Sequence, residues 1–278
     1  MFNSEIRESV VEGSFYPANP DVLKKEIAQF LDNAPDRKIK NISGLVCPHA
    51  GYMYSGEIAA CSYKQVMGMS YDCIFIIAPS HSEYFGFNSV FAGKAYQTPL
   101  GPVNVDQERC RLLAEDSRYD DFIKISDYGH RREHSLEVQL PFLQVSLNNF
   151  KIVPVVMGGQ KKQSIESLGI AIGNLFKWQD ILIVASTDLS HYHPYSVATD
   201  LDSMVVKDIK KFDPEEFSEA ISNDRLEMCG GGPVAAAMMA CKMLGADMAE
   251  VLCYKNSGDT SGDRSAVVGY LSAVFYKT

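Results

Sequence analysis

The sequence predicts an α/β protein with three layers, in which helices cover both faces of a central mixed, largely parallel sheet. Three short apolar runs support this prediction, because a strand buried on both faces reads as a continuous apolar stretch. Helical and strand-like patterns also alternate almost throughout the chain, as they do around a parallel sheet. The apolar runs are 45–47, 73–78 and 181–185.

The first half of the chain is divided by turn residues and by apolar spacing. Residues 1–20 read as an extended arm with turns near Gly13 and Pro20. Asp21 and Ser55 are suitable N-terminal caps for the two helices that follow. We expect helices at 21–31, 55–66 and 106–114, and strands at 44–47, 73–78 and 90–95.

The second half continues the alternation. Pro141 is expected to kink or restart one helix, and Pro233 suits the first turn of another. With no linker and no repeat period, we expect one domain over residues 1–278. The expected helices are 134–143, 164–176, 201–209, 214–221 and 234–244; the expected strands are 151–157, 181–185, 250–254 and 267–275; and 258–263 is expected to form a turn.

Charge and hydropathy exclude several classes of partner. The net charge is -9 and no basic stripe is visible, so we expect neither nucleic acid nor an anionic membrane surface as a partner. No stretch reaches the roughly 18 uninterrupted apolar residues of a membrane helix. The N-terminus lacks the basic-then-apolar pattern of a signal peptide, which predicts a cytoplasmic protein.

The chain has 7 cysteines and no Cys-x-x-Cys pair. In a reducing compartment most of them are expected to be buried thiols that act as small apolar side chains. Those embedded in apolar patterns are Cys47, Cys61, Cys73, Cys241 and Cys253.

Each of the three apolar runs is followed by a histidine within a few residues: His49, His81 and His191. The carboxyl ends of neighbouring parallel strands meet at one edge of a sheet, so these imidazoles are expected to converge. One such histidine alone is more often a hydrogen-bonded structural residue. Three together favour a site for a transition metal, which neutral imidazoles commonly bind.

Cys229 is a further candidate ligand. It precedes three glycines and Pro233, which indicates a position near a helix N-terminus, where a thiol pKa is lowered. Glycines also let the backbone approach a bound group closely. The alternative is an inert buried thiol beside a tight turn.

Three more residues near these motifs are candidates for supporting roles. Asp188 could orient an imidazole or act as a base, or it could cap a helix after it. His134 and Glu137 are spaced to share one helical face, which suits a site wall or a solvated surface. His193 precedes a proline and is expected to be structural or at the rim of the site.

Other common chemistries lack their signatures. No Gly-x-Gly-x-x-Gly follows a strand, and no Gly-x-x-x-x-Gly-Lys-Ser/Thr is present, so nucleotide phosphates have no expected binding loop. The Gly-x-Ser-x-Gly elbow of α/β-hydrolases is also absent.

The motifs around the candidate residues resemble those of the Memo family, named for a human mediator of receptor-driven cell motility. The resemblance runs through essentially the whole chain in order. It implies a microbial member of the family, of the kind found beside a radical-SAM protein. The matching pieces are 13–17, 48–52, 79–81, 133–137, 186–191 and 229–230.

The resemblance implies a fold similar to class III extradiol dioxygenases, which hold non-haem iron(II) with two histidines and a carboxylate. His49 and His81 match the histidine ligands. His191 matches a cavity histidine that is an acid or base in dioxygenases and is often treated as a ligand in Memo proteins. Cys229 falls where the dioxygenase carboxylate would be.

That departure makes ring cleavage an open question, because a thiolate is softer than a carboxylate. Iron(II) is the expected ion, with copper as the second choice and zinc as a fallback occupant. His49, His81, His191 and Cys229 are the implied ligands, and His191, Asp188 and His134 the implied catalytic or tuning residues.

Three functions fit these residues. The first is a metal-dependent oxidoreductase that acts on O2 and a small aromatic or organic substrate. The second is a binding or signalling module that recognises a peptide or small ligand without turnover; the motifs contain few Arg or Lys residues for phosphate capture. The third is a reservoir that sequesters iron or copper.

Overall fold

The structure, a computed structural model, describes residues 5–278. Within this range the chain forms a nine-stranded sheet and a separate three-stranded sheet. The small sheet holds β1 (Ile6–Arg7), β5 (Ala95–Tyr96) and β6 (Val103–Asn104). The large sheet holds β2 (Ile42–Cys47), β3 (Cys73–Pro79), β4 (Asn88–Val90), β7 (Ile123–Ile125), β8 (Ile152–Met157), β9 (Ile181–Ser186), β10 (His191–His193), β11 (Met248–Asn256) and β12 (Val267–Tyr276).

The large sheet is mixed, with a parallel centre. Its order is β10-β12-β2-β9-β3-β8-β4-β7, and β11 pairs with β12. Strands β2, β9, β3 and β8 run parallel to one another, whereas β12 and β4 join this centre antiparallel. The three apolar runs of the sequence are therefore adjacent strands, as predicted.

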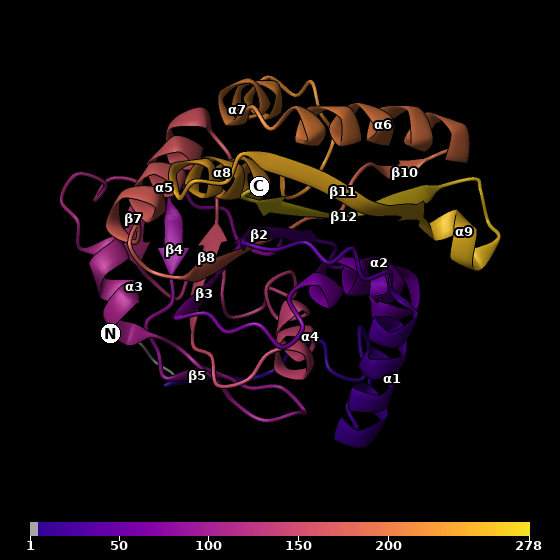
Figure 1. Cartoon of the computed structure of the whole chain (residues 1–278), viewed down its shortest axis with the longest axis horizontal. Coiled ribbons are helices and arrows are strands. Elements are labelled where there is room, and N and C mark those ends of the chain that lie inside the picture. Colours follow the sequence, from indigo (N-terminus) through magenta and orange to yellow (C-terminus); the bar gives the residue numbers. More distant parts are fainter. Residues whose placement is uncertain (1–4) are drawn as a thin grey trace.

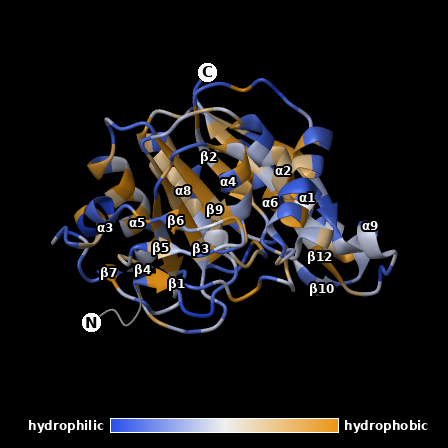
Figure 2. Cartoon of the chain, turned by 90° about the horizontal axis from the view of Figure 1, so that it is seen from below, coloured by the Kyte–Doolittle hydropathy of each residue, from blue (hydrophilic) through white to orange (hydrophobic). Residues whose placement is uncertain are grey.

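The central strands are almost entirely buried because helices cover both faces of the sheet. Figure 1 shows one group of helices above the sheet and another below it. The hydrophobic colouring of Figure 2 is concentrated on the central strands. This confirms the predicted α/β architecture. The helices are α1 (Pro20–Asn33), α2 (Tyr52–Gln65), α3 (Gln107–Ala114), α4 (Gln139–Ser146), α5 (Lys162–Leu175), α6 (Tyr195–Lys211), α7 (Pro214–Ser222), α8 (Gly231–Met243) and α9 (Ser257–Ser261).

Helices α8 and α2 make the main contacts with the parallel centre. Helix α8 packs against β9, β3 and β2, and α5 and α7 pack against α8. Helix α2 packs against β2 and β12, and α1 and α4 lie beside it. Within the described residues, no helix has both the length and the apolarity needed to cross a bilayer.

Two predicted helix caps were wrong. Asn19, not Asp21, caps α1: its side chain accepts hydrogen bonds from the backbone N–H groups of Asp21 and Val22. Helix α2 starts before Ser55, whose hydroxyl donates to the Ala50 carbonyl instead. In both cases the true start lies within three residues of the predicted one, because the chain turns at the preceding Asn or Gly.

Three other segments differ from the prediction. Residues 135–138 form turns, and α4 begins only at Gln139, with Pro141 in its first turn. The predicted turn at 258–263 lies largely within the short helix α9, which Asn256 caps together with Asp259. The predicted strand at 90–95 is split between the end of β4 and the start of β5.

The prediction of free thiols was wrong for two cysteines. Cys61 on α2 and Cys253 on β11 form a disulfide across 192 residues of sequence. Their apolar neighbours gave no sign of pairing, because burial suits both a thiol and a disulfide. The bond ties the helix that follows His49 to the antiparallel edge of the sheet. The other five cysteines of the chain are free.

His130 is a buried structural histidine. Its Nε2–H donates to the Ser89 carbonyl at 2.9 Å, so its Nδ1 accepts the hydrogen bond from the Tyr96 hydroxyl. Burial disfavours the charged ring and lowers the pKa of His130 to about 3. In the neutral ring both nitrogens still have hydrogen-bond partners.

We expect replacement of Cys61 and Cys253 by alanine to lower the free energy of unfolding by about 2–4 kcal/mol, because the cross-link restricts the unfolded chain. Urea denaturation measures this. Dithiothreitol should lower the midpoint of the wild type but leave that of the double variant unchanged. Seven free thiols in unreduced, unfolded wild type, instead of the five expected, would contradict the disulfide.

We expect acid to destabilise the fold through His130. The unfolded imidazole takes up a proton below pH 6.5, whereas the folded one stays neutral down to about pH 3. The unfolded state therefore binds more protons in this window, and stability falls as the pH falls, by about 1.4 kcal/mol per pH unit. Unfolding of His130→Gln, which keeps one donor and one acceptor, should show a correspondingly shallower pH dependence than the wild type.

Candidate metal centre

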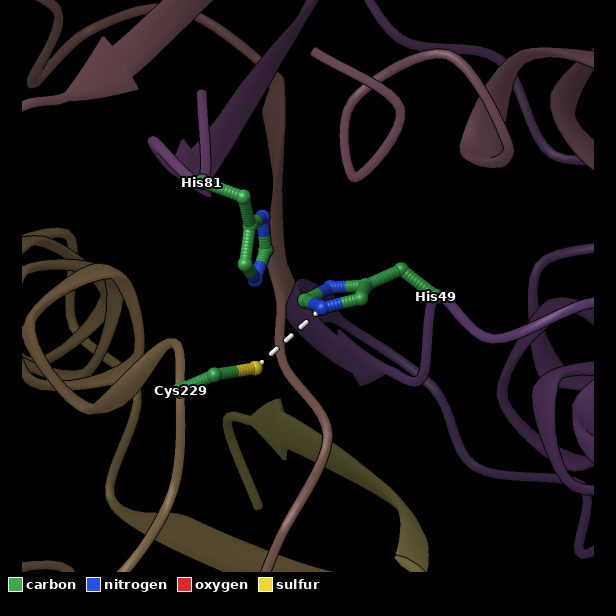
Figure 3. Close-up of side chains that lie close together, drawn as sticks. All are labelled: His49, His81 and Cys229. Atoms are coloured by element: carbon green, nitrogen blue, oxygen red, sulfur yellow. Dashed lines mark hydrogen bonds between the residues drawn. The ribbon is translucent and has the colours of Figure 1, made fainter. Parts of the chain in front are cut away.

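The candidate site lies at the carboxyl ends of β2 and β3, where the chain brings together two imidazoles and a thiol. The ligand atoms of His49, His81 and Cys229 all lie within 4.8 Å of one another. The two imidazole centroids are 5.1 Å apart, with their planes nearly perpendicular. Figure 3 shows the three side chains pointing toward a common centre from three different segments. Residues 180 positions apart in the sequence thus meet.

The hydrogen bonds of Ser186 fix the tautomer of His49. The Ser186 hydroxyl donates its proton to the Ser135 carbonyl at 2.7 Å, so its oxygen can only accept at its 2.9 Å contact with His49 Nδ1. His49 therefore carries its proton on Nδ1 and directs the Nε2 lone pair toward Cys229 Sγ, 3.2 Å away. Burial keeps His49 neutral by lowering its pKa well below the usual range.

A carboxylate holds His81 in the equivalent way. Glu133 Oε1 lies 2.9 Å from His81 Nδ1, and Oε2 accepts the backbone N–H of His81 at 2.6 Å. Burial alone would lower the pKa of His81, but the Glu133 hydrogen bond and charge outweigh it and raise the pKa. Burial alone would raise the pKa of Glu133, yet His81 lowers it to about 2. This contact leaves Nε2 of His81 free for the site.

The loop carrying Cys229 packs directly on the end of β9. A Cβ on Gly230 would lie 2.2 Å from the Ser186 carbonyl oxygen, so only glycine permits this approach. Cys229 stands just before α8, as predicted, and its backbone N–H donates to the Asp188 carbonyl. The Asp188 N–H in turn donates to Cys229 Sγ at 3.2 Å.

The predicted lowering of the Cys229 pKa was wrong for the protein without an ion. Burial raises this pKa, and the nearby Asp188 carboxyl raises it further. These two effects outweigh the favourable position before a helix N-terminus. The thiolate that a metal would bind therefore has to form as the metal displaces the proton.

Asp188 is a bridge between loops rather than a helix cap. No helix follows it; the next element is β10. Its Oδ1 accepts the backbone N–H of His49 at 2.8 Å, and its Oδ2 lies 3.9 Å from His49 Nε2. Burial raises the pKa of Asp188 to about 7, so the carboxyl can exchange a proton near neutral pH. Its predicted role as a base or orienting group stays a prediction.

His134 forms one wall of the site. Its ring centroid lies 4.8 Å from that of His81 and 5.5 Å from that of His49, and Phe15 packs on it at 4.9 Å. The donor atoms of His81, Glu133 and His134 also lie within 4.8 Å of one another. Burial lowers the pKa of His134, which favours a neutral ring.

His191 lies at the edge of the centre. Among the described residues, it is not part of either group of three donors within 4.8 Å. Its backbone N–H donates to Glu227, whose carboxylate also contacts Nε2 of His193 at 2.9 Å. Burial lowers the pKa of His191. Its role as a fourth ligand or proton carrier stays a prediction, as does the expected place of His193 at the rim; the structure shows His193 Nε2 in contact with Glu227.

One side of the centre is open. His49 is 2% exposed, whereas the side chains of His81 and His134 are 34% and 23% exposed. A ligand can therefore reach the donors from the side of His81 and His134.

Glu137 does not line the site with His134, although both belong to one motif. It is fully buried and anchors the N-terminal arm: it pairs with Arg7 and accepts the Tyr16 hydroxyl and the backbone N–H groups of Val10 and Val11. The arm thereby holds Phe15 against His134.

Sequence reasoning missed Glu133 and Ser186 as the partners of the two imidazoles. Both stand inside the quoted motifs, next to His134 and ahead of Asp188. The position of Glu133 next to His134 in the sequence was the one sign that this carboxylate could contact a histidine. Nothing in the sequence shows that it faces a different histidine, 52 residues earlier.

The model of the family described as Memo-like protein matches residues 7–274. The chain belongs to this family. Two similar relatives are MEMO1 family proteins of archaea: one from Methanobrevibacter smithii is 40% identical over 97% of this chain and 99% of its own length. The other, from Nitrosopumilus maritimus, is 37% identical over 95% and 98%.

A solved structure supports the fold. An uncharacterized protein of Escherichia coli K12 superposes with a TM-score of 0.59 over 84% of this Memo-like chain and 99% of its own. The two sequences are 15% identical, so the likeness concerns the fold alone.

We expect Arg7→Met to lower the free energy of unfolding by about 3–5 kcal/mol, because it leaves the buried Glu137 carboxylate without its ion pair. Lys94→Met is the matched control: it removes the other ion pair of the arm, with Glu5, which is exposed. That change should cost less than about 1 kcal/mol. Equal losses in the two variants, measured by urea denaturation, would show that the Arg7 pair does not hold the arm.

Proposed function

We propose that this Memo-like protein is a metal-dependent oxidoreductase that binds iron, or copper, through His49, His81 and Cys229. The observation that supports it best is the convergence of two imidazole nitrogens and a thiol sulfur within 4.8 Å. Both Nδ1 atoms are bonded within the chain, to Ser186 and Glu133, so both rings offer their lone pairs to the same centre.

The donor set fits a redox-active transition metal. Imidazole suits iron, copper and zinc, and a thiolate adds a soft, strongly donating ligand. Three protein donors and one open side leave room for further ligands. Bound there, iron or copper would supply the electron-transfer chemistry between O2 and an organic substrate.

The surrounding residues have matching chemical capacities. Burial lowers the pKa values of His134 and His191, so each ring favours its neutral form and can offer a nitrogen lone pair to an entering hydroxyl group. Asp188, with its pKa near 7, can hold or release a proton beside His49. Phe15 on His134 adds an apolar contact for a small aromatic substrate.

The first test is metal content. We expect anaerobically purified wild type to hold about one iron or copper ion per chain, and His49→Ala to lose it. His193→Ala is the matched control, because His193 bonds Glu227 at the rim and is not among the three donors; its metal content should equal that of the wild type. Equal metal in His49→Ala and wild type would rule out the site.

The second test is oxygen consumption by the iron(II)-loaded protein with a panel of catechols. Uptake that depends on both substrate and Cys229 supports an oxidoreductase. Retained metal without uptake favours a metal reservoir, and tight binding of a ligand without uptake favours a binding module.

A further inference from the structure

We propose that Glu133 is a positioning residue for the metal centre, which sets both the tautomer and the orientation of His81. This inference rests on the proposed metal-dependent function and assigns a role to a residue outside the three donors. Glu133 would act through His81 and would not bind the ion itself.

The contacts of Glu133 are those of a fixed acceptor. Its side chain is 1% exposed, and both oxygens receive hydrogen bonds. Oε2 accepts the backbone N–H of His81 at 2.6 Å, and Oε1 accepts the backbone N–H of Ser135 at 3.0 Å and faces His81 Nδ1 at 2.9 Å. An ionised carboxylate only accepts, so the proton of the imidazole sits on Nδ1.

The orientation of the His81 ring depends on a hydrogen bond more than that of the His49 ring does. His49 is 2% exposed and packed in place, whereas the His81 side chain is 34% exposed in an irregular loop after β3. A ring that water reaches can turn and change tautomer. Glu133 holds both the backbone and the ring of His81, which keeps Nε2 directed at the centre.

The alternative is a second ion held by His81, Glu133 and His134, whose donor atoms also lie within 4.8 Å. Such an ion, if bound through Glu133 Oε1, would have to displace the contact of that oxygen with His81 Nδ1. It would also compete with the Ser135 N–H for Oε1. The existing hydrogen bonds therefore favour a carboxylate that orients a histidine, an arrangement typical of metal sites.

The test compares Glu133→Gln with Glu137→Gln. Glu137 is the matched control: it is an equally buried carboxylate four residues later, but it holds the N-terminal arm. Zn(II) affinity, measured by competition with a chelator on protein shown to be folded, should fall about 10- to 100-fold in Glu133→Gln. It should be unchanged in Glu137→Gln, even if that variant is less stable.

A measurement on the wild type makes the test independent of how the variants fold. In Zn(II)-loaded protein, 15N NMR of the histidine rings should show His81 protonated on Nδ1 and bound to the metal through Nε2. Metal on Nδ1 would overturn the proposal, as would wild-type affinity in folded Glu133→Gln. So would two Zn(II) ions per chain of which His134→Ala removes one.

These failures differ from failure of the proposed function. If wild type and His49→Ala bind Zn(II), iron and copper equally poorly, the metal centre itself is refuted, and the role of Glu133 falls with it. If wild type binds metal and only the Glu133 results disagree, the metal centre stands and the positioning role alone is wrong.

Discussion

The parallel pairing of β2, β9 and β3 is the constraint on which the rest of the molecule depends. The register pairs Cys47 with Ser186 and Ile77 with Ala185, so the three strands end close to one another. Neighbouring strands lie about 4.8 Å apart. Residues that leave these ends within two or three positions are thereby held near one another, whatever the sequence distance between them. Strand order thus brings His49 and His81 together, and the loop before α8 adds Cys229.

A second constraint is the irregular segment that leads into α4. Glu133 contacts His81, the Ser135 carbonyl accepts from Ser186 beneath His49, and Gln139 donates to both Ser186 and the Pro48 carbonyl. Glu137 holds the N-terminal arm. One segment thus supports both imidazoles and the arm that covers His134.

The fold, and the meeting of His49 with His81, were predictable because each rests on a local pattern. A continuous apolar run marks a buried strand, and a histidine after it marks the strand end. The partners were not predictable, because Glu133, Ser186 and the Cys61–Cys253 bond depend on which distant segments meet. The predicted lowering of the Cys229 pKa was wrong for a related reason. Glycines and a proline in the sequence indicate a helix N-terminus, but they do not show that the thiol is buried beside Asp188.

The contacts of the three donors also limit what the site can recognise. The described hydrogen-bond partners of His49, His81 and Cys229 come from neutral or acidic residues, with Ser186, Glu133 and Asp188 the nearest. The Arg7 guanidinium donates its hydrogen bonds to Glu137 and to the backbone carbonyls of His130 and Glu133. A phosphate or carboxylate entering the open side would therefore meet no guanidinium or ammonium group among these partners, and would have to be held by the metal ion itself. A neutral ligand faces no such charge conflict, so these contacts support the proposed small organic substrate over an anionic peptide.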